Sequence, residues 1–173
     1  MAHFQRSSGQ IILFILSLIG TAMAIYLTIV HYNTHVALVC SSNGLVNCEH
    51  VLASPYASIP GSSFPVSVAG IVWSAIGAVL AALAWLVWPE KRLVRIAELM
   101  WAAIGMLTVF YLVYVEIVIL HTICAWCTAV HVTVLLYLLI AVFLVSLSTD
   151  GQEAETEREE LAFEMKSKAP TIE

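Results

Sequence analysis

Charged side chains are scarce in this sequence. Only 11% of its 173 residues are Asp, Glu, Lys or Arg, whereas 61% are apolar. Soluble globular domains carry about 25% charged residues, so the composition excludes an ordinary soluble domain and indicates an integral membrane protein. We expect the lipid bilayer to surround the chain, and we expect no nucleic-acid partner.

The apolar residues gather in four long runs, at residues 10–31, 65–88, 96–120 and 124–147. A run of this length extends about 33 Å or more as a helix, enough to cross a hydrocarbon core of about 30 Å. The first run exceeds the 7 to 15 apolar residues typical of a signal peptide, so we expect it to remain as a helix. The sequence therefore predicts an all-α fold, an integral membrane four-helix bundle.

Lys and Arg are missing from two segments, residues 32–64 and 121–123. All seven basic residues flank the opposite ends of the expected helices: Arg6, Lys91, Arg92, Arg95, Arg158, Lys166 and Lys168. Basic loops stay on the cytoplasmic side. We therefore expect a multi-pass protein of the plasma (inner) membrane with both termini cytoplasmic. The expected parts are a cytoplasmic N-terminus (1–9), a four-helix domain (10–147) and an acidic cytoplasmic tail (148–173).

The outer loop, residues 32–64, is broken by Pro and Gly in its second half but keeps large apolar side chains at Leu52, Tyr56, Ile59 and Phe64. We expect an extracytoplasmic capping loop with short helical pieces lying across the bundle. A simple connector is the alternative. The first two helices each carry a row of small residues that allows close contact with a neighbouring helix: Ser17, Gly20 and Ala24 in the first, and Gly70, Ser74, Ala78 and Ala82 in the second.

All four cysteines lie on the side without basic residues, where disulfides persist. Cys40 and Cys48 are in the outer loop, and Cys124 and Cys127 begin the fourth helix. A Cys-x-x-Cys pair is typical of a zinc half-site, a haem attachment motif or a dithiol redox centre. Thr128 stands where haem attachment needs His, and the seven residues between Cys40 and Cys48 do not suit a zinc knuckle. Redox chemistry is favoured, and we expect no metal.

The start of the fourth helix offers a reason for reactivity. Free backbone amides and the positive end of the helix dipole stabilise a thiolate at Cys124. Cys127 lies one turn deeper on the same side, which indicates a relay from water to lipid. An apolar pocket there suits a quinone as electron acceptor. His131, a further turn down, can hydrogen-bond a quinone oxygen, and a histidine bonded to a neighbouring helix is the alternative.

Glu116 is the only carboxylate that we place inside a helix. Its position near the outer rim of the third helix favours snorkelling towards water or pairing with His121. A role in proton transfer is the less favoured alternative.

These residues together resemble a known family. Cys40 and Cys48 are separated by seven residues, Ser54 follows after five more, and "CAWC" at 124–127 opens the last of four helices. This pattern is similar to the vitamin K epoxide reductase family, especially its bacterial homologues in disulfide-bond formation. The resemblance covers roughly residues 10–147.

The resemblance implies a role for each residue. Cys40 would exchange with a partner protein, Cys48 would pass electrons to Cys124, and Cys127 would lie nearest a quinone. Ser54 would help to hold the cap or the quinone headgroup. His131 stands where the vertebrate enzymes carry a tyrosine near the quinone.

The implied activity is that of a quinone-dependent thiol oxidoreductase. Its partners would be a separate thioredoxin-like extracytoplasmic protein and a membrane quinone, menaquinone or ubiquinone. The alternatives are a vitamin K epoxide or quinone reductase, and a non-enzymatic membrane protein that is held by disulfides or handles metal.

Overall fold

The computed structural model describes residues 2–33, 40, 44–59, 61–62, 64–87 and 92–168. Its long helices are α1 (Ala2–Tyr32), α3 (Val66–Leu86), α4 (Arg92–Tyr114) and α5 (Ala125–Lys168). Four stretches are long and apolar enough to cross a membrane: Ser7–Tyr32, Val66–Leu86, Arg92–Ile119 and Ala125–Leu147. The predicted all-α, four-helix membrane architecture is confirmed.

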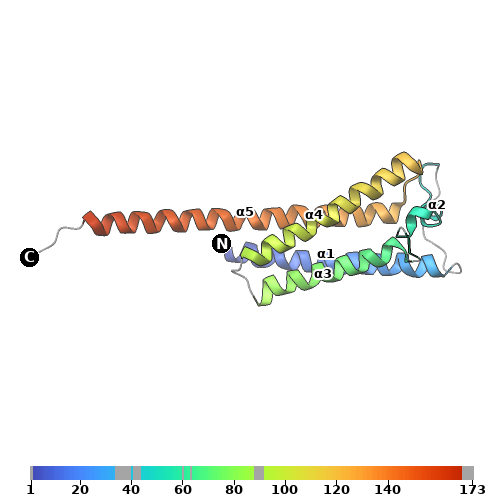
Figure 1. Cartoon of the computed structure of the whole chain (residues 1–173). Helices are drawn as coiled ribbons and strands as arrows, with labels where there is room; N and C mark the ends of the chain where they lie inside the picture. Colours follow the sequence, from blue (N-terminus) through green and yellow to red (C-terminus); the bar gives the residue numbers. More distant parts are fainter. Residues whose placement is uncertain are drawn as a thin grey trace, which may run out of the picture.

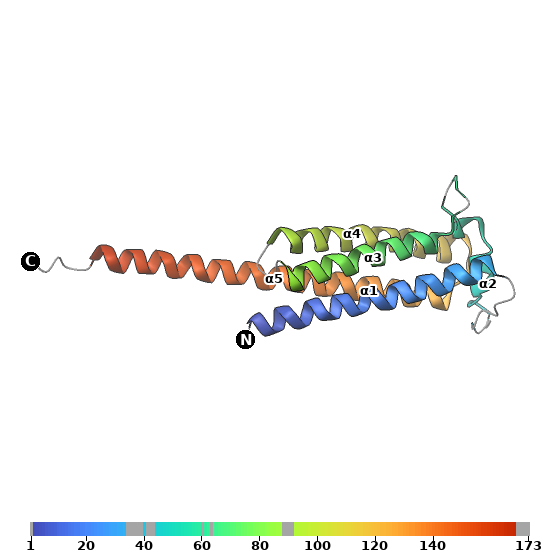
Figure 2. The same cartoon turned by 90° about the horizontal axis from the view of Figure 1, so that it is seen from below.

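The four helices form a closed ring of neighbours. Helix α1 packs against α3 and α5, and α4 packs against the same two helices. Successive helices run in opposite directions, so the α1–α3 and α4–α5 connections share one end of the bundle (Figure 1). The view from below shows the N-terminus and the exit of α5 together at the other end (Figure 2).

Small residues allow α1 and α3 to approach closely. A Cβ atom on Gly20 would lie 3.0 Å from Ser74 Oγ, and one on Gly70 would lie 3.5 Å from the Ala24 side chain. Lipid tails are as apolar as the helix surface, so close backbone packing is what holds such helices together. The predicted rows of small residues do lie at this contact, although α3 buries Ala81 and Ala84 more deeply than Ala82.

Two tryptophans join α3 to α4. Trp73 Nε1 donates to the Trp101 carbonyl oxygen at 3.2 Å, and Trp101 Nε1 donates to the Trp73 carbonyl oxygen at 3.0 Å. The Trp73 ring lies over Gly105, where an added Cβ atom would be 2.5 Å from ring carbons. The absence of a side chain at Gly105 therefore sets how closely the ring and α4 can pack.

A buried polar cluster occupies the end of the bundle where α4 begins. Glu98 is 1% exposed and accepts a hydrogen bond from Gln10 Nε2 at 3.0 Å. Arg95, 6% exposed, lies one turn before Glu98 and acts on it electrostatically. The expectation that Glu116 is the only carboxylate within a helix is wrong. An adjacent cation and an amide from another helix offset part of the cost of burying this second carboxylate.

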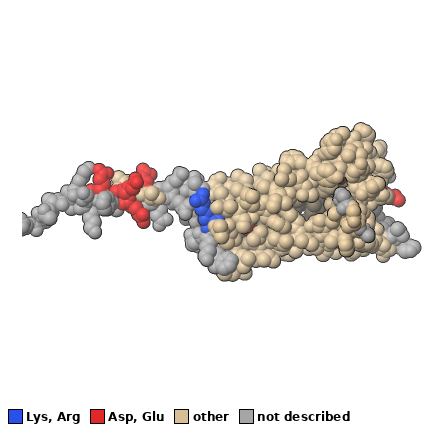
Figure 3. All heavy atoms as spheres, viewed as in Figure 1, with Lys and Arg blue, Asp and Glu red and all other residues tan. Residues whose placement is uncertain are grey.

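The exposed charged side chains that the structure describes lie at the ends of the molecule. Lys and Arg gather where α5 leaves the bundle, acidic residues cover the projecting part of α5, and the body between is almost free of charge (Figure 3). Helix α5 continues without a break from Ala125 to Lys168. The described side chains of its outer part, including Glu157 and Glu160, are exposed.

We predict that Gly105→Ala destabilises the bundle by roughly 1–3 kcal/mol, because the new methyl group displaces the Trp73 ring. Gly70→Ala is the matched control, since its methyl group would meet Ala24 at an ordinary 3.5 Å, and it should be neutral or slightly stabilising. Thermal unfolding in detergent would measure both. Equal melting temperatures for the two variants would contradict the proposed tight contact.

Candidate functional site

The loop between α1 and α3 contains two short helical pieces, α2 (Cys48–Leu52) and η1 (Pro55–Ala57). Asn47 caps α2, because its side-chain oxygen accepts a hydrogen bond from the His50 backbone N–H at 3.0 Å. These pieces lie over the end of the bundle (Figure 1). The predicted cap with short helices is therefore confirmed.

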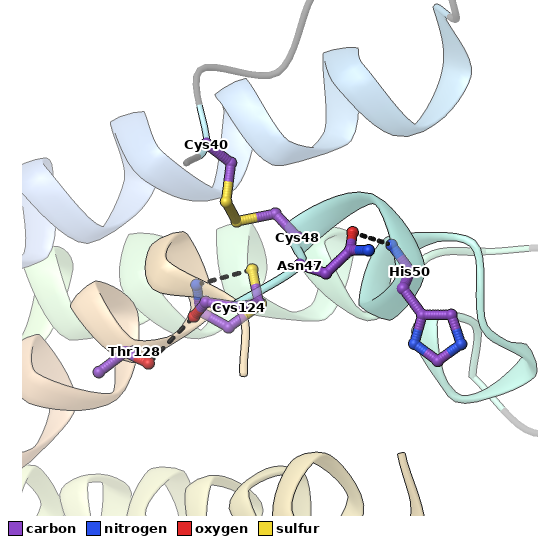
Figure 4. Close-up of a disulfide and its surroundings, with 7 residues drawn as sticks. Cys40, Asn47, Cys48, His50, Cys124 and Thr128 are labelled. Carbon is purple, nitrogen blue, oxygen red and sulfur yellow. Dashed lines mark hydrogen bonds between the residues drawn. A yellow bond between two sulfur atoms is a disulfide. The ribbon is translucent and has the colours of Figure 1, made fainter. Parts of the chain in front are cut away.

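A short backbone pairing joins this cap to the residue before Cys124. Val46 forms a parallel bridge with Ile123. The Asn47 N–H donates to the Ile123 carbonyl at 3.1 Å, and the Ile123 N–H donates to the Leu45 carbonyl at 2.9 Å. Cys48 and Cys124 directly follow Asn47 and Ile123, so the pairing brings these two cysteines together. The close-up shows Cys124 next to the disulfide that contains Cys48 (Figure 4).

The four cysteines form two pairs. Cys40 and Cys48, the loop pair, are joined by a disulfide. Cys124 and Cys127, the helix pair, are free thiols. Cys48 is 1% exposed and Cys124 is 0% exposed, so their contact is shielded from water. The structure thus holds an oxidised loop pair beside a reduced helix pair.

Cys124 immediately precedes α5 and accepts a hydrogen bond from the Cys127 backbone N–H, 3.3 Å from its sulfur. The pKa of Cys124 is lowered, chiefly by a hydrogen bond with the Cys127 thiol and further by the backbone N–H groups of Cys127 and Trp126, against the effect of burial. A thiolate at this position is therefore stabilised by the first turn of the helix, the effect that its place in the sequence predicts.

A cavity of about 640 Å³ lies inside the bundle beneath the cap. Residues of all four long helices and of the cap line it, and most of them are apolar. Cys127 is among the described residues on its wall, whereas Cys124 is not. The two sulfurs of the helix pair thus have different neighbours: Cys124 faces the loop disulfide, and Cys127 faces the cavity.

Ser54 and His131 also line this cavity, from opposite sides. Ser54 belongs to the cap, where its hydroxyl donates to the Val51 carbonyl oxygen at 2.7 Å. His131 is 8% exposed and lies one helical turn below Cys127. An apolar cavity of this size with few polar side chains fits a quinone headgroup. The structure therefore groups both predicted cofactor-binding residues with Cys127.

Glu116 lies at the same cavity, and the expectation that it snorkels or pairs with His121 is wrong. The end of α4 widens into a π-helical turn, η2 (Val115–Ile119), and Glu116 within it is only 5% exposed. Its carboxylate is hydrogen-bonded to the Cys124 backbone and to the Cys127 side chain. It neither snorkels nor pairs with His121, which is exposed. The sequence did offer one indication of this contact: Glu116 is a carboxylate within an apolar run, only eight residues before Cys124.

No group of three or more His, Cys, Asp and Glu side chains is arranged to hold a metal ion within the residues that the structure describes. The described side chains that line the cavity include Cys127, Glu116, His131 and His31.

Comparison with protein families gives a match. The model of the family described as "Vitamin K epoxide reductase family" matches residues 11–142, which is more than half of the chain. The matched region contains all four cysteines, Glu116 and His131. No curated protein matches the sequence.

We predict that Cys127→Ala raises the pKa of Cys124, because it removes the thiol whose hydrogen bond is the largest cause of the lowered value. The variant and the parent protein are both compared with Cys40 and Cys48 replaced by Ala, so that only the helix pair titrates. The thiolate absorbance near 240 nm should then appear at higher pH in the Cys127→Ala variant than in the parent. Cys127→Ser keeps a hydroxyl donor and should shift the titration less. Coincident titrations for the two variants would show that this hydrogen bond does not control Cys124.

Proposed function

Because the chain belongs to the vitamin K epoxide reductase family, we propose that this membrane thiol oxidoreductase passes electrons from a thioredoxin-like extracytoplasmic protein to a membrane quinone. The activity would support disulfide-bond formation. The observation that carries the proposal is the placement of the helix pair, with Cys124 beside the loop disulfide and Cys127 on the wall of an apolar cavity.

The reaction begins at the loop pair. Cys40 is partly exposed, whereas Cys48 is almost wholly buried, so a thiolate arriving from outside meets Cys40 first. Its attack on Cys40 forms a mixed disulfide and releases Cys48 as a thiolate. The second thiol of the partner then displaces Cys40. The partner leaves with a disulfide, and the loop pair becomes a dithiol.

Electrons then move from the loop pair to the oxidised helix pair. Cys48 attacks the neighbouring Cys124, which breaks the Cys124–Cys127 bond, and Cys40 then attacks Cys48 and releases Cys124. The lowered pKa of Cys124 makes it a good leaving group in this second step. The products are a loop disulfide and a helix dithiol, the combination present in the structure.

The helix pair passes its electrons to an acceptor bound in the cavity. A quinone bound there supplies a two-electron acceptor, menaquinone or ubiquinone, with Cys127 nearest to it. His131 and Ser54 would orient the headgroup from the bundle and from the cap, and the apolar walls would keep water from the exchanging sulfurs.

The proposed orientation follows from the distribution of charge. Basic side chains gather at the end of the bundle where α5 exits (Figure 3), whereas the described part of the cap has none. Basic segments remain in the cytoplasm. We therefore assign both termini to the cytoplasmic face of the plasma (inner) membrane and the cap to the outer face.

We predict that Cys48→Ser holds a partner protein that carries a single cysteine, because the mixed disulfide between that cysteine and Cys40 has no resolving thiol on either side. Cys40→Ser should hold little or none, since Cys48 is buried. The partner is supplied with its cysteine as a thionitrobenzoate mixed disulfide, so that Cys40 attacks the partner sulfur and releases thionitrobenzoate, and non-reducing electrophoresis of the purified variants measures the adduct. Abundant adduct with Cys40→Ser would overturn the assignment of Cys40 as the entry thiol.

We predict that His131→Phe raises the KM for quinone by about tenfold, the effect of losing a hydrogen bond of roughly 1.4 kcal/mol. The exposed His121→Asn is the matched control and should keep the parent value. Anaerobic mixing of the reduced protein with ubiquinone, menaquinone or vitamin K epoxide would give the rates. Oxidation of the helix pair by the epoxide and by neither quinone would replace the proposed function with the sister activity.

A further inference from the structure

Among the residues that the structure describes, Glu116 is the one carboxylate in contact with the helix pair. It is 5% exposed, and its carboxylate accepts hydrogen bonds from the Cys124 backbone N–H and from the Cys127 thiol. Both donors are neutral groups. Burying a carboxylate with only neutral partners is costly.

The backbone is shaped to place Glu116 there. In the π-helical turn the Leu120 N–H donates to the Val115 carbonyl at 2.9 Å, five residues back. The wider turn lets Val115 and Glu116, which are consecutive, both point into the bundle, with exposures of 3% and 5%. Single π-helical turns within α-helices often occur at functional sites.

The Cys127 thiol has one proton and two acceptors. One is the Cys124 sulfur, and the other is the Glu116 carboxylate. As Cys124 enters a disulfide its sulfur ceases to be a useful proton acceptor, and Glu116 is then the acceptor that remains in contact. A water-poor site disfavours two negative charges, one on Glu116 and one on Cys127, at the same time. Transfer of the proton from Cys127 to Glu116 avoids this, because the total charge of the two groups stays the same.

We propose that Glu116 is a catalytic residue whose carboxylate takes the proton of the Cys127 thiol as the helix pair is oxidised. The inference rests on the proposed function, because it names the proton acceptor of the same reaction. Two S–H bonds break and one S–S bond forms between Cys124 and Cys127. The two electrons and two protons that leave the thiols reduce the quinone to a quinol, and Glu116 regains its negative charge when it passes its proton on.

The opposite step uses the same group. When Cys48 attacks the oxidised helix pair, Cys127 is the leaving group and needs a proton. The loop dithiol gives up two protons as it becomes a disulfide, and Glu116, protonated by one of them, passes it to the Cys127 sulfur that it contacts. Glu116 thus serves as base when electrons leave the helix pair and as acid when they arrive.

The test combines Glu116→Gln with two readouts that should move in opposite directions. Gln has nearly the same shape and keeps an oxygen that accepts the Cys127 hydrogen bond, but it cannot take the proton. Quinone reduction in a single turnover should therefore slow by about 100-fold. The pKa of Cys124, lowered mainly by the Cys127 hydrogen bond and raised by the charge of Glu116, should fall further, so that thiolate absorbance appears at lower pH.

A merely structural contact would not give more thiolate together with less turnover. Glu116→Asp keeps a carboxylate at slightly greater distance and should retain part of the turnover, which keeps the test decisive if the Gln variant folds poorly. Glu98→Gln is the matched control, since it removes the other buried carboxylate of α4 far from the cysteines. It should lower the melting temperature and leave the titration and the turnover rate unchanged.

The outcomes separate the two proposals. Turnover in Glu116→Gln within about twofold of the wild type would overturn the role of Glu116 alone. A wild-type protein without quinone-dependent oxidation of the helix pair would instead overturn the proposed function, while the titration would still report whether Glu116 acts on Cys124.

Discussion

The backbone pairing between residues 45–47 and Ile123 is the contact on which the sulfur geometry depends. A loop with several prolines and glycines has no regular structure that would hold a cysteine at a chosen place. Two N–H···O bonds supply that constraint, because they fix the backbone directly before Cys48 and Cys124. The pairing selects Cys48, rather than Cys40, as the neighbour of Cys124.

The two buried carboxylates of α4 show two ways of tolerating charge in an apolar bundle. Glu98 is balanced by Arg95 and held by Gln10 from α1, an arrangement that fixes helix positions. Glu116 has only neutral hydrogen-bond donors in contact, one of which is a thiol that can give up its proton. The first arrangement is suited to holding a structure together and the second to moving a proton, although both belong to the same helix.

Composition and run length were enough to predict the four helices, because a membrane span needs little more than sufficient apolar length. The small residues of α1 and α3 were also readable, since helical spacing places them on one face. Glu98 was missed because its partner Gln10 is 88 residues away in sequence, and no local pattern announces such a pair. The bridge between Val46 and Ile123 and the π-helical turn at Glu116 are likewise set by tertiary packing. The spacing of Cys124, Cys127 and His131 on one helix could be read directly, whereas the disulfide state of each pair could not.

A relay between two cysteine pairs needs one fixed part and one part that changes partners. Helix α5 is the fixed part, because Cys127 and His131 lie on a single rigid helix packed against α1 and α4. Cys48 is tied to the same region, since its neighbour Asn47 is bonded to Ile123. The sulfurs of Cys48, Cys124 and Cys127 are therefore held relative to one another by this pairing and by α5. Cys40 joins them through its disulfide with Cys48 and is itself partly exposed, which suits the sulfur that must also meet an outside protein.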